Sequence, residues 1–193
     1  IMNIDKRLEQ KIGFDRIRQI ISDRCSTEYA AERTATECFS TDLSVIRKRL
    51  LLTDEMRLIM MFEDSFPSGG FIDCIGFLKP LEMSSSAIDL ISIRKLRTML
   101  DTLRKVTSFF NGVKDEVYPN LKRMASPIMG FPEVQRRIDL IIDRYGEVKD
   151  TASDELYEIR KSLRDKEGAI SRRMSAILKK AQEEGIVDSD AGV

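Results

Sequence analysis

Apolar side chains recur along this chain at alternating intervals of three and four residues, and this spacing limits the fold more than any other feature of the sequence. One heptad-like stripe is formed by Leu43, Ile46, Leu50, Thr53, Arg57 and Met60. Such spacing places side chains on one face of an α-helix, whereas a half-buried strand needs strict alternation, which is nearly absent. The sequence therefore predicts an all-α fold with little or no sheet.

Capping and stop residues divide this pattern into successive helices. A break rich in Ser, Pro and Gly at residues 65–70 separates two long helical stretches. The residues expected to open or cap helices are Ser26, Thr41, Ser86 with Asp89, Pro119 and Ser153. The residues expected to end helices are Pro80, Asn111-Gly112 and Tyr145-Gly146.

The last predicted helix is the longest. Its apolar stripe consists of Leu156, Ile159, Leu163, Ile170, Met174, Ile177 and Ala181. About 30 helical residues span roughly 45 Å, more than the roughly 30 Å expected for a compact body of about 150 residues. We therefore expect a helical core over residues 1–150, a projecting helix over 151–184 and a truncated tail over 185–193, all cut from something larger. The distal stripe, from about Ile170 onward, is expected to self-associate or fold back.

Composition excludes several kinds of chemistry. The chain has no histidine, which removes Ser-His-Asp and Cys-His nucleophiles and His-ligated metals. Cys25, Cys38 and Cys74 have the spacing of neither a zinc site nor a redox pair, so we expect reduced thiols that pack in the core of a cytoplasmic protein. No apolar run is long enough to span a bilayer, so no membrane contact is expected. A net charge of zero gives no global attraction to nucleic acid.

Three further features resemble functional sites but fit structural roles better. The loop at residues 65–70 lacks the Lys-Ser/Thr pair of a phosphate-binding loop. The acidic pairs Glu63-Asp64 and Asp188-Asp190 have no nucleophile beside them, which favours solvated surface. The methionines on helical stripes, Met60, Met61 and Met174 among them, are expected in the core. We therefore expect no catalytic, cofactor-binding or metal-binding residue in this chain.

One local charge feature favours binding. Between Arg160 and Lys180 there are eight basic and two acidic residues, a local net charge of +6. Lys166, Arg173 and Lys180 lie seven residues apart and form a row along one edge of the apolar stripe. Such a row suits contact with a phosphate backbone, although no aromatic residues interleave with it for base stacking. An ordinary solvated face is the alternative.

The start of the last helix carries a resemblance. Residues 150–160 resemble the D-x-A-S-x-x-L-x-x-I-R signature of MutS proteins, matched by Asp150, Ala152, Ser153, Leu156, Ile159 and Arg160. Upstream segments at residues 12–17, 66–73 and 118–121 agree in order, so the resemblance covers roughly residues 12–181. It is nearest to the second bacterial paralogue of the MutS family, which begins with the core domain and ends in a small nuclease domain called Smr.

The resemblance implies a role for the chain within a longer parent protein. The chain would be the non-catalytic core and lever at the start of an ATP-dependent nucleic-acid-binding protein, with residues 151–184 ascending toward a clamp. For the parent it implies ATP and magnesium, a nuclease domain, a homodimer, DNA or structured RNA as partner, and a mismatch-repair-like role in restraining recombination or rescuing stalled ribosomes. The ATP-binding and nuclease motifs, and the descending helix that returns from the clamp, have no counterpart in this sequence. A self-contained helical adaptor that binds proteins and no nucleic acid is the alternative.

Overall fold

The structure, a computed structural model, describes residues 6–37, 39–83, 86–188 and 190. Over these residues the chain is helical and contains no β-strand, and its extended pairing is an isolated antiparallel bridge between Ile142 and Val148. The predicted all-α class is confirmed. The chain divides into two compact units, Ile1–Gln135 and Arg136–Val193.

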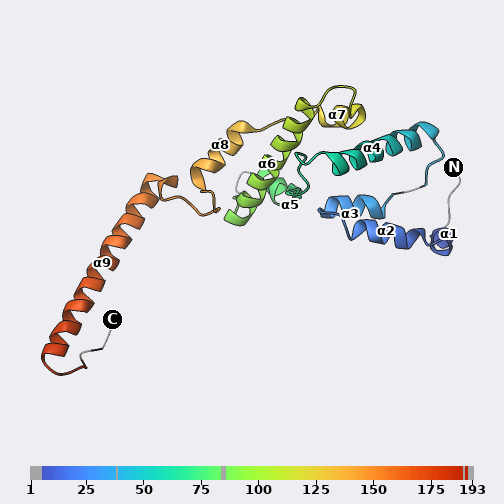
Figure 1. Cartoon of the computed structure of the whole chain (residues 1–193). Helices are drawn as coiled ribbons and strands as arrows, with labels where there is room; N and C mark the ends of the chain where they lie inside the picture. Colours follow the sequence, from blue (N-terminus) through green and yellow to red (C-terminus); the bar gives the residue numbers. More distant parts are fainter. Residues whose placement is uncertain (1–5, 38, 84–85, 189, 191–193) are drawn as a thin grey trace. The chain divides into compact units, whose positions relative to one another are not determined.

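Figure 1 shows the order of the helices along the chain. The first unit contains α1 (Lys6–Lys11), α2 (Phe14–Ser22), α3 (Glu28–Ala35), α4 (Leu43–Phe62), α5 (Ile75–Leu78), the 3₁₀ helix η1 (Lys79–Glu82), α6 (Leu90–Gly112) and α7 (Pro119–Ala125). Helix α8 (Pro132–Ile141) begins in the first unit and ends in the second. The second unit also holds the 3₁₀ turn η2 (Asp150–Ala152) and α9 (Asp154–Glu183).

Three helix starts differ from the prediction. The caps found, with the predicted residue in parentheses, are Thr27 (Ser26) for α3, Asp42 (Thr41) for α4 and Asp89 (Ser86) for α6. In each case the capping residue has an extended backbone directly before the first turn, from which its side-chain oxygen reaches an otherwise unsatisfied amide. Pro119 in the first turn of α7 and Ser153 as the cap of α9 are confirmed.

The predicted helix ends were accurate only in part. Helix α6 ends at Gly112 as predicted, but this glycine has no left-handed backbone, and the extended residue Val113 follows it. Helix α8 ends at Ile141 rather than near Tyr145, because the next residues form a tight turn in which Gly146 has φ of 83°. Helix α5 ends at Leu78, before Pro80 as predicted, and the 3₁₀ helix η1 follows with the proline in its first turn.

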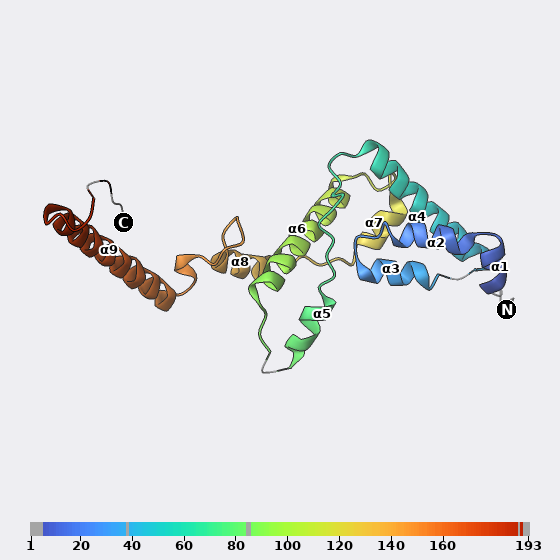
Figure 2. The ribbon, with the colours of Figure 1, turned by 90° about the horizontal axis from the view of Figure 1, so that it is seen from below.

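The core of the first unit lies where α4, α6 and α7 meet. Its buried members are Ile59, Val106, Phe109, Phe110, Tyr118, Leu121 and Ala125. The rings of Phe109 and Phe110 meet edge to face, with centroids 5.1 Å apart, a favoured aromatic geometry. Figure 1 and Figure 2 show the short helix α7 beside α6 and α4. This small cluster orients the long helices of the unit.

A buried carboxylate joins α4 to α7. Glu55 is 8% exposed, and its Oε2 accepts a hydrogen bond from the Leu121 amide at 2.7 Å. Its Oε1 accepts from the Asn120 amide at 3.1 Å and from Asn120 Nδ2 at 2.6 Å. The first amides of a helix have no intrahelical partner and carry partial positive charge. Glu55 therefore caps α7 from another helix, 65 residues away in the sequence.

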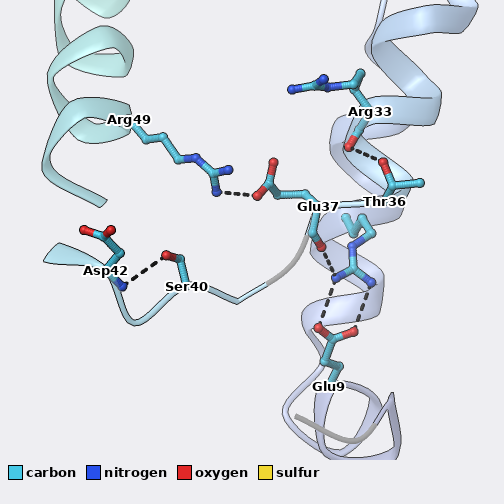
Figure 3. Close-up of polar contacts among 8 residues, drawn as sticks. Glu9, Arg33, Thr36, Glu37, Ser40, Asp42 and Arg49 are labelled. Carbon is cyan, nitrogen blue, oxygen red and sulfur yellow. Dashed lines mark hydrogen bonds and ion pairs between the residues drawn. The ribbon is translucent and has the colours of Figure 1, made fainter. Parts of the chain in front are cut away.

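Polar contacts hold the first three helices together. Arg18 of α2 donates to both carboxylate oxygens of Glu9, at 3.0 and 3.1 Å, and to the Glu37 carbonyl at 3.0 Å. The Glu37 carboxylate accepts from Arg49 of α4 (Figure 3). Neither α2 nor α3 contains a buried residue. The α1–α3 segment is therefore joined to α4 mainly through charged side chains.

The heptad-like stripe of α4 does not face the core. Leu43, Leu50 and Met60 are 66%, 65% and 60% exposed. The opposite face, with Glu55 and Ile59, is the buried one. Helix α4 carries apolar residues on both faces, so spacing alone could not identify the core side. The predicted placement of Met60 and Met61 in the core is wrong, because both are 60% exposed.

The described cysteines are unpaired thiols. Cys74 is buried, and burial together with the neighbouring Asp73 charge raises the pKa of its thiol above the ordinary value. Cys25 is partly buried, and Cys38 lies outside the described residues. Over the part of the chain that is described, no helix is both long and apolar enough to cross a bilayer.

Replacing Glu55 with Ala should destabilise the first unit by about 3 kcal/mol. The change removes an acceptor for the Asn120 and Leu121 amides and leaves polar groups unsatisfied near the core. Urea unfolding followed by circular dichroism measures the loss. The matched control is Asp54→Asn, which alters an exposed carboxylate one residue away and should cost under about 1 kcal/mol. Equal stabilities for the two variants would contradict the capping role.

Candidate functional site

Helix α9 starts at a well-defined cap. The Ser153 backbone is extended, and its Oγ accepts a hydrogen bond from the Leu156 amide at 3.1 Å. Asp154 and Glu155 occupy the first turn, where negative charge is favoured by the helix dipole. The helix then runs for 30 residues and contains no buried residue.

An ion cluster of Asp150, Arg160 and Arg164, which we call the lock, fixes the base of α9. Arg160 Nη1 donates to Asp150 Oδ1 at 2.6 Å and to the Val148 carbonyl at 2.9 Å. Arg164, one turn further along, donates to Asp150 Oδ2 at 2.8 Å. Asp150 thus receives two guanidinium groups from successive turns of the helix that follows it. The hydrogen bonds from Arg160 and Arg164 hold the pKa of the Asp150 carboxyl below its usual value, and the bond from Arg160 has the larger effect.

A tight turn before the lock fixes its other side. The Asp143 amide donates to the Glu147 carbonyl and the Lys149 amide to the Ile141 carbonyl, each at 2.9 Å. The Asp143 carboxylate accepts from the Glu147 amide at 2.9 Å. This turn presents the Val148 carbonyl to Arg160. The end of α8 and the start of α9 are therefore joined by a continuous set of hydrogen bonds.

The signature residues divide into two groups. Asp150, Ser153 and Arg160 take part in the lock and the cap. Ala152 ends η2 and Leu156 is partly buried, whereas Ile159 is 57% exposed and opens the apolar stripe. Sequence spacing could not distinguish these roles. Arg164 lies outside the signature, and its place in the lock was not predicted from the sequence.

The basic row lies on the exposed surface of α9. Lys166, Arg173 and Lys180 are all exposed. Lys180 lies 3.6 Å from Glu184, an exposed pair that contributes little. Among the described residues Lys166 and Arg173 form no ion pair with a carboxylate. The row is therefore accessible to an anionic partner, and its contact with nucleic acid stays a prediction.

The apolar stripe of α9 is exposed along its length. Its exposed members are Ile159, Leu163, Ile170, Met174 and Ile177, at 48–65%. Exposure thus begins nearer the base than the predicted Ile170. Met174 does not lie in a core, contrary to the prediction. A continuous apolar stripe on one helix is typical of a surface that meets another helix.

The first unit contains an apolar groove that was not predicted from the sequence. Its volume is about 800 Å³, and its walls come from α3, residues 71–78, α6 and the segment before and within α8. Representative lining residues are Tyr29, Phe71, Leu96, Met99 and Phe131. The sequence shows a dense run of apolar residues after Gly70. Nothing in this run indicates which other segments of the chain it packs against. The groove has the size and apolar lining of a ligand or helix-binding site.

The described residues offer neither a metal-binding cluster of side chains nor a phosphate cradle at the loop of residues 65–70. The described part of the chain has no group of three or more His, Cys, Asp or Glu side chains suited to hold a metal ion. The loop at residues 65–70 packs against α6, because Thr102 donates to the Gly70 carbonyl at 3.1 Å. A Cβ at Gly70 would overlap the Thr102 hydroxyl. This backbone therefore faces a helix rather than forming an open phosphate cradle.

Comparison with known proteins supports the resemblance. The chain is 26% identical over 179 residues to a protein of Listeria monocytogenes serotype 4a named Endonuclease MutS2. Proteins of the same name from Thermomicrobium roseum and Geobacillus sp. are 28% and 25% identical over 177 and 182 residues. These matches cover 89–91% of this chain and 22% of each relative. No family model matches the chain. The resemblance predicted from the signature is confirmed as a relationship to MutS2-type proteins.

Replacing Asp150 with Asn should loosen the base of α9. The carboxylate that binds Arg160 and Arg164 is lost, so amide hydrogen exchange over residues 148–160 should accelerate several-fold. Asp165→Asn removes an exposed carboxylate from the same helix and serves as the control. Unchanged exchange in the Asp150 variant would rule out the lock.

The lock should also depend on pH in a defined direction. Because the pKa of Asp150 is lower in the folded state than the ordinary value of about 3.9, its stabilising contribution is present above the ordinary value. It is lost as the pH falls through the folded pKa. The exchange difference between the native chain and Asp150→Asn should therefore persist at pH 5–7 and vanish only in stronger acid.

Proposed function

We propose that this chain, as a relative of MutS2-type proteins, is the non-catalytic core-and-lever scaffold of a longer nucleic-acid-binding ATPase. The observation that carries the proposal is the lock at Asp150, which ties a 30-residue helix to a tight turn. A helix of about 30 residues extends roughly 45 Å. With its base fixed, a displacement of the turn moves the far end of the helix as one body.

The scaffold acts by mechanical transmission. ATP and magnesium would be bound by other parts of the parent; the described residues here contain no group of three or more side chains suited to a metal ion. The Arg160 and Arg164 contacts keep the start of α9 aligned with the turn at residues 142–149. The parent's ATPase, nuclease and homodimeric assembly are part of the same proposal, since this chain spans only about a fifth of the length of its relatives.

The apolar stripe of α9 requires a partner in this scheme. The stripe runs from Ile159 through Leu163 and Ile170 to Ile177, and each of these side chains is exposed. In the proposed parent the descending helix that returns from the clamp covers this stripe. In the isolated chain the same stripe would drive self-association, which Met174→Asp and Ile177→Asp should reduce.

The basic row gives the lever a nucleic-acid contact. Lys166, Arg173 and Lys180 lie along one edge of the stripe, so a helix that covers the stripe leaves this edge open. Such contacts bind phosphates without reading sequence. The row therefore suits both DNA, as in the restraint of recombination, and structured RNA, as in the rescue of ribosomes.

The groove favours a second candidate function, a helical adaptor that binds proteins. Its lining is almost wholly apolar, which suits an amphipathic helix more than a nucleic acid. If the chain is a scaffold, the rest of the parent covers the groove. If it is an adaptor, the groove stays open in the full-length protein.

A fluorescent apolar dye, anilinonaphthalene sulfonate, distinguishes these functions. The isolated chain should bind the dye, and Leu96→Asp in the groove should reduce the signal severalfold. The scaffold predicts little Leu96-dependent signal in the full-length parent. The matched control is Leu51→Asp on the exposed surface of α4, outside the groove. Full Leu96-dependent signal in the parent would favour the adaptor.

Replacing Lys166, Arg173 and Lys180 together with Glu should weaken nucleic-acid binding by the parent. Three phosphate contacts correspond to a salt slope of about 2.7, so the slope of log K against log salt should fall by about that amount. The charge-matched control changes Lys161, Arg172 and Lys179, on another side of α9, to Glu. If both triple variants bind equally well, the row is solvated surface.

A further inference from the structure

The exposed stripe of α4 has no role in the fold or in the proposed function. Leu43, Leu50 and Met60 are at least 60% exposed, and Ile46 is 36% exposed. The buried face of the same helix, with Glu55 and Ile59, lies on the opposite side. The stripe spans about 18 residues, or roughly 27 Å of helix. A stripe of this length and spacing is typical of helices that pair.

We propose that the α4 stripe pairs with the α4 stripe of a second copy of this chain, in antiparallel orientation. The heptad has two core positions. One is occupied by Leu43, Leu50 and Arg57, and the other by Ile46, Thr53 and Met60. Antiparallel pairing brings one kind of position opposite the other. Leu43 then meets the second copy's Met60, Leu50 meets its Thr53, and Ile46 meets its Arg57.

The flanking charges match this register. Arg47 and Asp54 lie seven residues apart and occupy the same heptad position, on one side of the stripe. In an antiparallel pair, residues at this position of one copy face residues at the same position of the other copy. Arg47 of each copy therefore faces Asp54 of the other, which gives two ion pairs by symmetry. Asp54 already binds Arg57 of its own chain at 2.7 and 3.1 Å, through Oδ1 alone. Its second carboxylate oxygen can accept a hydrogen bond from the opposing Arg47.

Parallel pairing is disfavoured by the same residues. It would set Arg57 directly against Arg57 of the other copy between the two stripes, where like charges repel. Its flanking ion pairs would use Arg49 and Asp42, but Arg49 already binds Glu37 and Asp42 caps α4. The antiparallel register instead sets Arg57 against an isoleucine, along which its aliphatic stem can pack.

This proposal is independent of the core-and-lever function. It concerns α4 in the first unit and uses no residue of the lock, the basic row or the groove. The lever is tested by nucleic-acid binding of the parent, whereas α4 pairing is tested by substitutions on α4, so failure of one can be told apart from failure of the other.

Disulfide trapping tests the register. In a background with Cys25, Cys38 and Cys74 changed to Ser, two single variants are prepared, Leu50→Cys and Thr53→Cys. Antiparallel pairing predicts that a mixture forms disulfides mainly between the two different variants, which mass spectrometry identifies by mass. Disulfides mainly between identical variants would mean parallel pairing and would overturn the proposal.

Charge exchange tests the same contact without cysteine chemistry. Arg47→Glu and Asp54→Lys should each weaken the dimer about fivefold in sedimentation equilibrium, because each change disrupts two ion pairs. The double variant should restore the affinity to within about twofold of the native chain. The control is Lys48→Glu, an exposed charge change on the other side of α4, which should have no effect.

Two results would overturn the proposal outright. One is a chain that stays monomeric at every concentration tested, in which case another part of the parent covers the stripe. The other is association abolished by Met174→Asp but unaffected by Leu50→Asp, which would assign the contact to α9. Loss of association in Leu50→Asp, with an unchanged circular dichroism spectrum, supports pairing through α4.

Discussion

The carboxylate of Glu55 is the interaction on which the first unit depends. It lies on α4, yet it satisfies the first amides of α7, a helix that has only seven residues and starts with a proline. Short helices are marginal in isolation, so α7 needs both this cap and the packing of Leu121 and Ala125. Once α7 is fixed, it closes the space between α4 and α6 and completes the aromatic cluster around Phe109. One buried charge thereby orients the longest helices of the unit.

The second unit also depends on a carboxylate, but the main partners of that carboxylate are charged side chains rather than backbone amides. There an aspartate precedes its helix, and two arginines of that helix reach back to it. Neither unit relies on a large apolar core: α9 contains no buried residue, and the buried cluster of the first unit is small. Directional polar contacts therefore set the geometry, and apolar surface is left exposed for other partners.

Local chemistry made some helix boundaries predictable from the sequence. Ser153, Pro119 and the 30-residue length of α9 followed from capping preferences and spacing. The side of α4 that faces the core was not predictable, because both faces are apolar and only the distant Asn120 and Leu121 select one. The lock was visible in part, since Asp150 and Arg160 belong to a recognisable signature. The role of Arg164 and the presence of the groove were not predicted, because both arise from contacts between separate segments of the chain.

The charged attachment of α1–α3 has a consequence for cooperativity. Helices α2 and α3 bury no residue, and the contacts of Arg18 and Arg49 with Glu37 carry much of their connection to α4. Ionic contacts at exposed positions weaken as salt rises, while the aromatic cluster of Phe109, Phe110 and Tyr118 does not. The amino-terminal helices should therefore detach at a lower free energy than the rest of the unit opens. Thermal melting in high salt would then proceed in two steps, and a single unfolding free energy would not describe the chain.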